Sequence, residues 1–432
     1  MPFRKGFPLI TPSTIGQDSD KPLLDVENLR VYYPVKGPLI QKIFQREKLS
    51  VHAVDGVSFT LKPGEIFGLV GESGCGKTTT GRAVLRLVDP TSGSIKFEGM
   101  NITRLKEERL RPLRTRMQII FQDPHASLNP AMSIGRAIGH PLKIHHLAWQ
   151  EEDVKKQVLT AMREVGLTPE EQLYDKYPSD LSGGQKQRVV IARAMILKPK
   201  LIVADEPVAM LDMSIRAKVL ELMLDLKKKY NLTYLFITHD LATAKFLCDR
   251  IAIMYLGRIV ETGPAKLIYN DPKHPYTKAL LQAIPIPDPR RRARKVLPKG
   301  EVPDAVNPPM GCRFHPRCPA VLPTCGWEGK DFLDYLEERR TDLEQGKVDE
   351  ANLGPLDLWK AKGLLAERQC RPENIAVITE YVRSVLNEAP FPLSKAVERV
   401  RNVENRLVVQ FRNPDPLAPK EVEGRLVECL LY

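Results

Sequence analysis

Residues 66–78 read Ile-Phe-Gly-Leu-Val-Gly-Glu-Ser-Gly-Cys-Gly-Lys-Thr, and this stretch decides the fold of the surrounding chain. Its first five residues form a continuous apolar run that is followed by glycine, which is typical of a buried parallel strand. Residues 77–87 then predict a helix, which Asp89-Pro90 ends. The glycines between them fit the pattern G-x-x-x-x-G-K-[ST]. We therefore expect a P-loop, whose backbone N–H groups converge on phosphate oxygens.

Two side chains of this loop have the chemistry to complete a nucleotide site. Lys77 can bridge the β- and γ-phosphates of ATP, and the hydroxyl of Thr78 can ligate Mg²⁺. Further contacts are expected from Gly71, Ser73, Gly74, Cys75, Gly76 and Thr79. A chance glycine-rich turn is the alternative, and the strand before the loop and the helix after it argue against that alternative.

A second buried strand, Leu-Ile-Val-Ala-Asp over residues 201–205, ends in two adjacent carboxylates. Asp205 at the strand end can hold Mg²⁺ through water, and Glu206 can act as the general base that polarises an attacking water. An acidic pair after an apolar strand is a weak signal by itself. In the same chain as the P-loop it becomes a strong one.

Another glycine-rich loop, Ser182-Gly183-Gly184-Gln185, opens a helix. Its N–H groups at a helix N-terminus predict a second anion site. Because the P-loop already accounts for the phosphates of one ATP, this second site needs a ligand from elsewhere. One interpretation is that this loop binds the γ-phosphate of ATP held by a partner subunit. The other is an ordinary helix cap, since Ser182 is a good N-cap residue.

The order of predicted elements indicates an α/β protein with a mostly parallel core. Antiparallel strands are expected over residues 23–62, around a basic loop at 36–48. Helices are expected over 150–166 and 215–229 and from Gln185 and Leu241, with a strand over 234–238. The boundaries predicted are a tail at 1–22, a nucleotide-binding domain at 23–262, a proline-rich basic linker at 263–300 and a C-terminal extension at 301–432.

Composition narrows the class of protein. The 432 residues are 43% hydrophobic and carry a formal net charge of +12. That balance suits nucleic acid, an anionic membrane surface or a phosphate ligand without choosing among them. No stretch approaches the roughly 18 apolar residues of a membrane span, and the first residues lack a signal-peptide core. A cytoplasmic protein is therefore expected, unless a partner carries it to a membrane.

The three motifs, in this order, resemble the Walker A, signature and Walker B elements of ABC ATPases, which implies an antiparallel β subdomain and a helical subdomain around the P-loop core. Gln122 resembles the Q-loop residue that contacts Mg²⁺, and Asp212 lies in a segment similar to the D-loop. His239 resembles the switch histidine that contacts the γ-phosphate. Tyr33 resembles the aromatic residue that stacks on adenine, with Tyr32 as its competitor.

Further segments are similar to the oligopeptide/dipeptide importer branch, and Ala283-Ile-Pro-Ile-Pro-Asp-Pro289 to its F-type subunits. The resemblance implies a peripheral ATPase on the cytoplasmic face of the membrane. Implied partners are a D-type ATPase in a heterodimer, two transmembrane permeases and, indirectly, an extracytoplasmic solute-binding protein. Peptides are the expected solute, with oligosaccharides or metal chelates as alternatives.

Two other functions are alternatives to transport. A non-transport ABC ATPase acting on nucleic acid or ribosomes would suit the positive charge, but the coiled-coil inserts, zinc modules or second cassette usual in such proteins are not evident, so no nucleic acid is expected. A catalytically silent regulatory cassette conflicts with the intact Lys77, Asp205, Glu206 and His239.

The chain contains seven cysteines. Cys75 and Cys248 are expected to be ordinary buried residues. Cys312, Cys318 and Cys325 cluster, and they resemble the cysteine-bearing extension of the importer branch. That resemblance makes Cys429, rather than Cys370, the fourth thiolate and favours a [4Fe–4S] cluster over zinc. Free thiols remain the alternative.

Between Cys325 and Cys429 the chain departs from its relatives, in which the spacer is far shorter. Residues of about 327–424 are expected to form a helical insertion, with short strands near 406–411 and 425–432.

Overall fold

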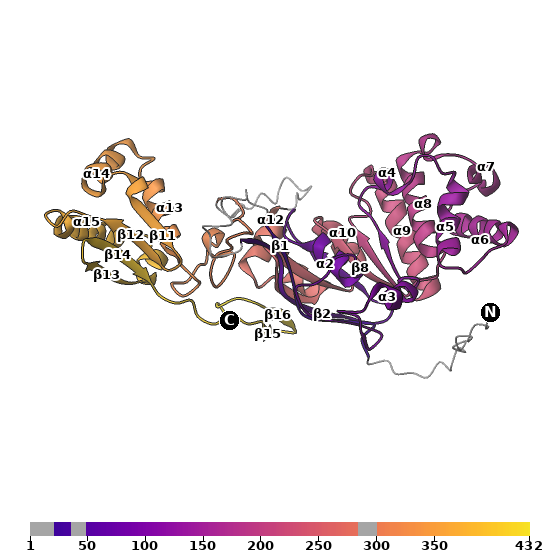
Figure 1. Cartoon of the computed structure of the whole chain (residues 1–432), viewed down its shortest axis with the longest axis horizontal. Helices are drawn as coiled ribbons and strands as arrows, with labels where there is room; N and C mark the ends of the chain where they lie inside the picture. The colour runs from indigo at the N-terminus through magenta and orange to yellow at the C-terminus, as the bar shows by residue number, and fades with distance from the viewer. Residues whose placement is uncertain (1–20, 36–48, 284–299) are drawn as a thin grey trace, which may run out of the picture.

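A computed structural model describes residues 21–35, 49–283 and 300–432 (Figure 1). The described chain is elongated. A group of helices (α5–α7) lies at one end, the sheets that carry the P-loop lie in the middle, and a separate α/β module formed by residues of the C-terminal extension lies at the other end. The expected basic loop at 36–48 and the basic run at 290–295 fall outside the described residues.

The largest described sheet has the strand order β15-β16-β10-β9-β3-β8-β7-β6. Its members β3, β6, β7, β8 and β9 run parallel, as the apolar runs predict, and β10 pairs antiparallel with β9. Every residue of β3, β7 and β8 is buried, so both faces of the sheet are covered. The strands are β3 (Ile66–Val70), β6 (Met117–Ile120), β7 (Leu201–Asp205), β8 (Thr233–Thr238), β9 (Arg250–Tyr255) and β10 (Arg258–Pro264).

A second, antiparallel sheet has the order β2-β1-β4-β5. It packs with α2 (Lys77–Val84) against one face of the large sheet, around a shared buried core that includes Leu24, Val54, Val84 and Leu235. The helix expected over 77–87 ends earlier because Arg86 adopts a φ of 54°. The elements are β1 (Leu24–Pro34), β2 (Ser50–Leu61), β4 (Ser92–Phe97), β5 (Met100–Asn101) and α3 (Glu107–Arg114).

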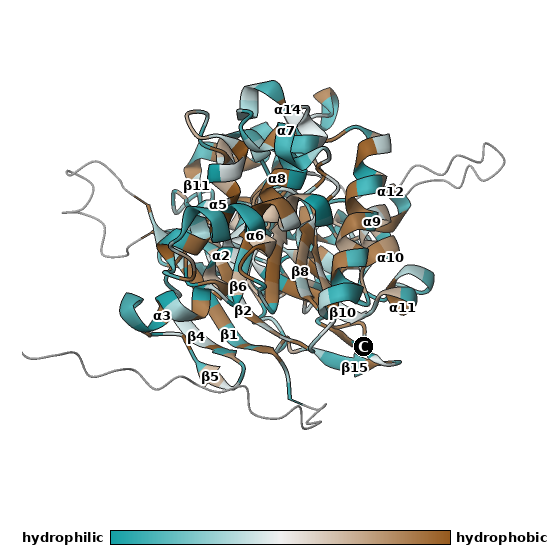
Figure 2. Cartoon of the chain, turned by 90° about the vertical axis from the view of Figure 1, so that its right-hand side faces the viewer, coloured by the Kyte–Doolittle hydropathy of each residue, from teal (hydrophilic) through white to brown (hydrophobic). Residues whose placement is uncertain are grey.

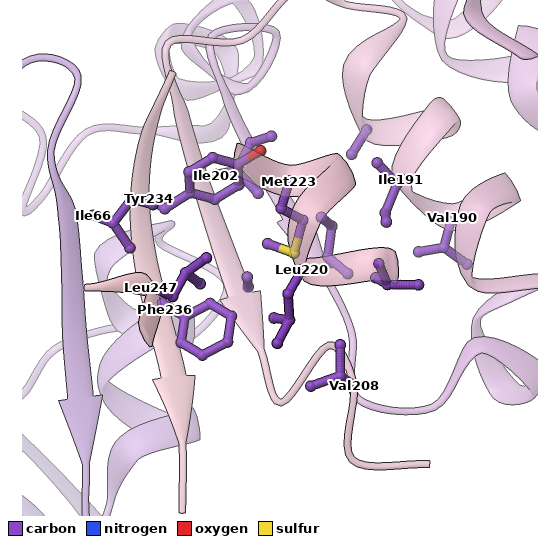
Figure 3. Packing of buried hydrophobic residues seen from close by; sticks show 14 of the residues in the cluster. Ile66, Val190, Ile191, Ile202, Val208, Leu220, Met223, Tyr234, Phe236 and Leu247 are labelled. Atoms are coloured by element: carbon purple, nitrogen blue, oxygen red, sulfur yellow. The ribbon is translucent and has the colours of Figure 1, made fainter. Parts of the chain in front are cut away.

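Helices cover the other face of the large sheet. Ile202, Tyr234 and Phe236 on the strands meet Leu220 and Met223 of α9, beside Val190 and Ile191 of α8 (Figure 3). Outer helices such as α6 and α7 are largely hydrophilic, whereas strands such as β8 are hydrophobic (Figure 2). The helices are α4 (Pro124–Ser127), α5 (Ile134–Ile144), α6 (Glu151–Glu164), α7 (Glu170–Tyr174), α8 (Gly183–Met195), α9 (Met213–Tyr230) and α10 (Leu241–Leu247).

The predicted linker at 263–300 is wrong over its first half. Residues of this segment form α11 (Ala265–Asn270) and α12 (Pro275–Ala283), and Tyr276 is fully buried. Among its described prolines, Pro264 is the N-cap of α11 and Pro275 opens α12, where proline is tolerated because its missing N–H would be unpaired anyway. Ala265, Ile268 and Tyr276 of these helices therefore pack into the same core as the large sheet.

The insertion contains the expected helices, but it also contains a sheet that the sequence did not predict. It contains a four-stranded antiparallel sheet, β11-β12-β14-β13, and has its own core, which includes Phe332, Trp359, Val382 and Phe411. The elements are α13 (Gly329–Arg339), α14 (Leu343–Leu353), β11 (Trp359–Lys362), β12 (Leu365–Gln369), α15 (Ile375–Glu388), α16 (Phe391–Ala396), β13 (Val397–Val403) and β14 (Arg406–Phe411). Of the two expected short strands, the one at 406–411 is confirmed and the one at 425–432 is confirmed over its first three residues.

After the insertion the chain returns to the large sheet. Strands β15 (Lys420–Val422) and β16 (Arg425–Val427) extend its edge, with Glu261 and Thr262 of β10 opposite Val427 and Leu426. Glu428 N–H donates to Val260 O at 2.9 Å. Within the described residues, no helix has both the length and the apolar character needed to cross a bilayer.

Candidate functional site

A cavity of about 620 Å³ opens where β3, β7 and β8 end. The strand ends deliver the loops that follow them to one edge of the sheet, which is where ligands bind in parallel α/β folds. Ten residues predicted from the sequence line this cavity: Gly71, Ser73, Gly74, Gly76, Lys77, Thr78, Thr79, Gln122, Glu206 and His239.

The loop before α2 has the backbone geometry that phosphate binding needs. Gly76 has a φ of 106°, and a Cβ at this position would lie 2.0 Å from Ala53 O, so only glycine fits there. The buried ammonium of Lys77 donates to Gly71 O and to Glu72 O, both at 2.8 Å. The loop therefore holds its lysine inside the turn, at the N-terminus of α2, where an anion is favoured.

Thr78 and Asp205 provide adjacent oxygen ligands. The hydroxyl of Thr78 donates to Asp205 Oδ1 at 2.9 Å, and Asp205 is 3% exposed. Burial raises the pKa of Asp205, and the neighbouring Glu206 contributes to the rise, while the Thr78 hydrogen bond opposes it. Hydroxyl and carboxylate oxygens are ligands that Mg²⁺ accepts, and a bound cation would favour the ionised carboxylate. The donor pair fits magnesium.

Glu206 lies between two polar side chains from different loops. Gln122 Nε2 donates to Glu206 Oε2 at 3.2 Å, and His239 Nδ1 lies 3.1 Å from Glu206 Oε1. Glu206 itself has a φ of 48°, in the left-handed region, and its N–H donates to Ile237 O. A strained backbone held by a hydrogen bond to the neighbouring strand aims this carboxylate into the cavity. The arrangement suits activation of a water molecule.

The remaining predicted residues lie outside the cavity wall. Cys75 is buried, with Sγ 3.8 Å from Lys77 Nζ. Asp212 is the N-cap residue of α9. Tyr33 is 39% exposed and does not line the cavity, and the ring of its competitor Tyr32 stacks on His52 at 4.3 Å. The adenine contact therefore stays a prediction.

The second glycine-rich loop is a helix cap. Ser182 and Gln185 form a reciprocal capping box, in which each side chain accepts a hydrogen bond from the backbone N–H of the other. No residue of this loop lines the cavity. Both interpretations from the sequence remain, because a capped N-terminus still presents its other N–H groups to an anion.

Several wall residues were missed by the sequence analysis. Val51, His52 and Ala53 come from β2, Leu256 and Gly257 from the turn after β9, and Leu280 from α12. Ala305 comes from the C-terminal extension, where its carbonyl accepts from His52 N–H at 2.9 Å. None of these residues belongs to a motif. Only the pairing of distant segments brings them to the phosphate loop.

The predicted cysteine cluster is gathered at the point where the extension leaves the large sheet and returns to it. Burial raises the pKa of Cys312 to about 12, and nearby Cys325, Cys429 and Cys318 add to the rise. Cys325 Sγ accepts from Leu322 N–H at 3.2 Å. Cys370 instead belongs to the separate core of the insertion.

All seven cysteines are free thiols, and among the described residues no group of three or more Cys, His, Asp or Glu side chains is arranged to hold a metal ion. The set fits a thiolate-ligated centre in its composition and location. It does not have the arrangement of a formed centre.

Two protein-family models match this chain. A family model described as "ABC transporter" matches residues 54–209, and one described as "Oligopeptide/dipeptide transporter, C-terminal region" matches residues 260–325. The second match ends at Cys325, where the insertion begins.

Among curated proteins, the oligopeptide transport ATP-binding protein AppF of Bacillus subtilis is 46% identical over 316 residues, which are 72% of this chain and 94% of AppF. The oligopeptide transport ATP-binding protein OppF of Salmonella typhimurium is 46% identical over 307 residues, which are 71% of this chain and 91% of OppF. Among solved structures, CbiO1 from Clostridium perfringens, part of an ABC transporter complex, is 27% identical with a TM-score of 0.49 and covers 58% of this chain and 92% of its own.

Proposed function

The chain belongs to the ATP-binding proteins of oligopeptide-type ABC transporters and is an ATPase, and from this premise we propose that it powers the import of di- or oligopeptides. Peptides are the proposed solute because AppF and OppF are both oligopeptide transport proteins. Permease subunits that span the membrane would carry the solute, with this chain on their cytoplasmic face. The same relatives favour transport over the nucleic-acid and ribosome alternative.

One observation carries the proposal for the chemistry: Gln122, Glu206 and His239 meet beside the P-loop in a single cavity. In this proposal Lys77 and the loop N–H groups bind the β- and γ-phosphates. Thr78, Asp205 and Gln122 would hold Mg²⁺, which when bound neutralises phosphate charge and aligns the phosphates. Glu206 accepts the proton of the attacking water, and His239 and Gln122 fix the position of its carboxylate.

Replacing Glu206 with Gln tests this role. The amide keeps the size and the hydrogen bonds of the side chain but cannot accept a proton. We expect ATP turnover to fall by about two orders of magnitude or more, while Mg-ATP binding persists. Glu65→Gln is a control, since Glu65 is a buried carboxylate just before β3, at the end of that strand away from the P-loop. Unchanged steady-state turnover of Glu206→Gln in the assembled transporter would refute the assignment.

The loop at Ser182–Gln185 supports a proposal about the partner. It presents a helix N-terminus to solvent and lies outside this chain's own cavity. We infer that it binds the γ-phosphate of ATP held by a second cassette, with Asp212 at the same junction. A D-type subunit is the proposed partner, in a heterodimer. The tagged chain can be purified from its native membrane together with its partners. Recovery of one different cassette with it supports this pairing, and recovery of a second copy of the same chain contradicts it.

The cysteines support a second centre. We propose that Cys312, Cys318, Cys325 and Cys429 ligate one [4Fe–4S] cluster, with Zn²⁺ as the alternative ion. When bound, such a cluster would serve as a structural cross-link between the start and the end of the extension. The side chains of the protein supply four thiols in a largely buried site, together with the Leu322 N–H that already donates to sulfur. Formation of the centre requires deprotonation of the thiols.

A further inference from the structure

The phosphate-binding loop contains a carboxylate that works against its own ligand. Glu72 follows the first glycine of the loop and lines the cavity, next to Ser73 and Gly74. An ionised carboxylate at the edge of a site for a polyanion repels that anion, by an energy that falls only inversely with distance. A functional site therefore needs a group that neutralises Glu72 or turns it away.

The C-terminal extension supplies that group. Arg317 Nη1 donates to Glu72 Oε2 at 3.1 Å, although the two residues are 245 positions apart. The Arg317 side chain is 10% exposed, and its guanidinium lies 5.9 Å from the ring centre of Tyr255 and 6.0 Å from that of Phe314. Two aromatic faces and limited solvent fix the cation, so this ion pair is stronger than an exposed one.

The backbone of Glu72 is fixed from the same side. Its N–H donates to the hydroxyl of Tyr276 at 3.0 Å. Tyr276 is fully buried, and its ring lies 5.3 Å from that of Phe314. The carbonyl of Glu72 accepts from Lys77 at 2.8 Å. All three polar groups of Glu72 thus have partners, two of them in segments outside the nucleotide-binding motifs.

We propose that Arg317 and Tyr276 are positioning residues of the nucleotide site: Arg317 neutralises Glu72 and holds it away from the phosphates, and Tyr276 fixes the backbone of the loop. The inference rests on the proposed nucleotide site. It assigns the segment between Cys312 and Cys318 a part in ATP affinity, because that segment carries the arginine. Tyr276→Phe removes only a hydrogen-bond acceptor, so its effect on affinity is smaller than that of losing the cation.

The test is equilibrium binding of a fluorescent ATP analogue to the full-length chain with Mg²⁺. We expect Arg317→Gln to weaken binding about tenfold, by exposing the phosphates to an unpaired Glu72. The double variant Arg317→Gln/Glu72→Gln should regain most of the affinity, because no carboxylate then remains to be neutralised. The defect of the single variant should also shrink at high salt, which screens the repulsion.

Three further variants separate the possible outcomes. Arg317→Lys keeps the charge but not the planar group that stacks on the two rings, so it should lose less affinity than Arg317→Gln, and it tests the charge if Arg317→Gln does not fold. Arg425→Gln is the matched control, since Arg425 is a buried arginine of the extension that bonds to Leu267 O and Asp271 O, not to the P-loop. Lys77→Ala tests the site itself.

If Lys77→Ala still binds the analogue, the proposed nucleotide site is wrong. If Lys77→Ala loses binding but Arg317→Gln binds as the native chain does, only the inference about Arg317 is wrong. A double variant as weak as Arg317→Gln would also overturn it, because repulsion from Glu72 would then not be the cause.

Discussion

Thr78 and Asp205 are 127 positions apart and already share a hydrogen bond of 2.9 Å. Cys325 and Cys429 have a similar separation in sequence, yet Cys325 Sγ accepts its hydrogen bond within its own turn, from Leu322. The nucleotide cavity is thus organised by direct contacts between its functional groups. The cysteine cluster is gathered by the strands around it, without a hydrogen bond that joins Cys325 to Cys429 among the described contacts.

The difference follows from the elements that carry each site. The cavity residues lie at the ends of parallel strands, where the ladder between β3, β8 and β7 sets their spacing to within a residue. The cysteines lie in turns and at the chain end, and the pairing of β16 with β10 brings Cys429 near the others. We therefore expect the side chains of the nucleotide cavity to be in place before ATP binds. The second region should gain its rigidity from a ligand.

The largest expected effect concerns the loop at Ser182–Gln185, which lies outside the cavity. Ser182→Arg places a bulky cation in the loop proposed to reach across to the partner's nucleotide. Nucleotide binding by this chain should persist, because the loop is outside its own cavity. Hydrolysis at the partner's site should fall by about two orders of magnitude or more. Site-specific turnover in the heterodimer, with Glu206→Gln silencing this chain, provides the measurement. Loss of binding by the isolated chain would mean that the loop serves the chain's own site.

The next effect concerns the cysteines and is one of stability rather than of turnover. Cys429→Ser should lose iron, and with it a cross-link over a loop of about 100 residues, worth about 4–5 kcal/mol at most on the scale used for disulfides. Cys370→Ser is the matched control, because Cys370 lies in the core of the insertion. Anaerobically purified native protein should contain about four irons per chain. Iron and zinc analysis with thermal unfolding gives the answer. Stoichiometric zinc without iron would assign the site to zinc, and no metal would leave free thiols.

The smallest effect lies between the two regions, at His274. This imidazole is 1% exposed, its Nδ1 accepts from Tyr276 N–H at 3.1 Å, and its ring lies 5.9 Å from that of Phe314. Burial lowers its pKa from 6.5 to about 3, and Lys278 adds to the decrease. Because the unfolded chain binds this proton below pH 6.5 and the folded chain does not, His274 contributes a loss of stability as pH falls from 6.5 toward 3.

Between pH 7 and pH 5 this contribution is about 2 kcal/mol. His274→Asn removes the titrating group and keeps an acceptor for Tyr276 N–H. Chemical denaturation at both pH values should therefore show a smaller pH dependence for the variant than for the native chain. Equal pH dependence in the two proteins would mean that His274 is solvated or paired in solution.

Much of the fold could be predicted wherever a short segment determines its own structure. The strand at 201–205 is confirmed to the residue, and the starts of α2 at Lys77 and of α10 at Leu241 lie where the sequence places them. These elements have continuous apolar runs or capping residues, which act within a few positions. The helices of the insertion were expected but its sheet was not, since Val397, Val400 and Val403 repeat every three residues, a spacing typical of a helix. They lie on a strand, β13, with an irregularity between Val397 and Arg399.

The sequence by itself indicated which groups are present: a phosphate loop and an acidic pair from local spacing, and a glutamine, a histidine and a set of thiols from resemblance to a family. Only the tertiary structure decided which of these groups meet. It brought Ala305 of the extension to the cavity wall, excluded Ser182 from the cavity and paired Glu72 with Arg317. The physical reason is the separation along the chain. A motif depends on contacts between neighbouring residues, whereas these contacts depend on strand pairing and packing between segments over 100 positions apart.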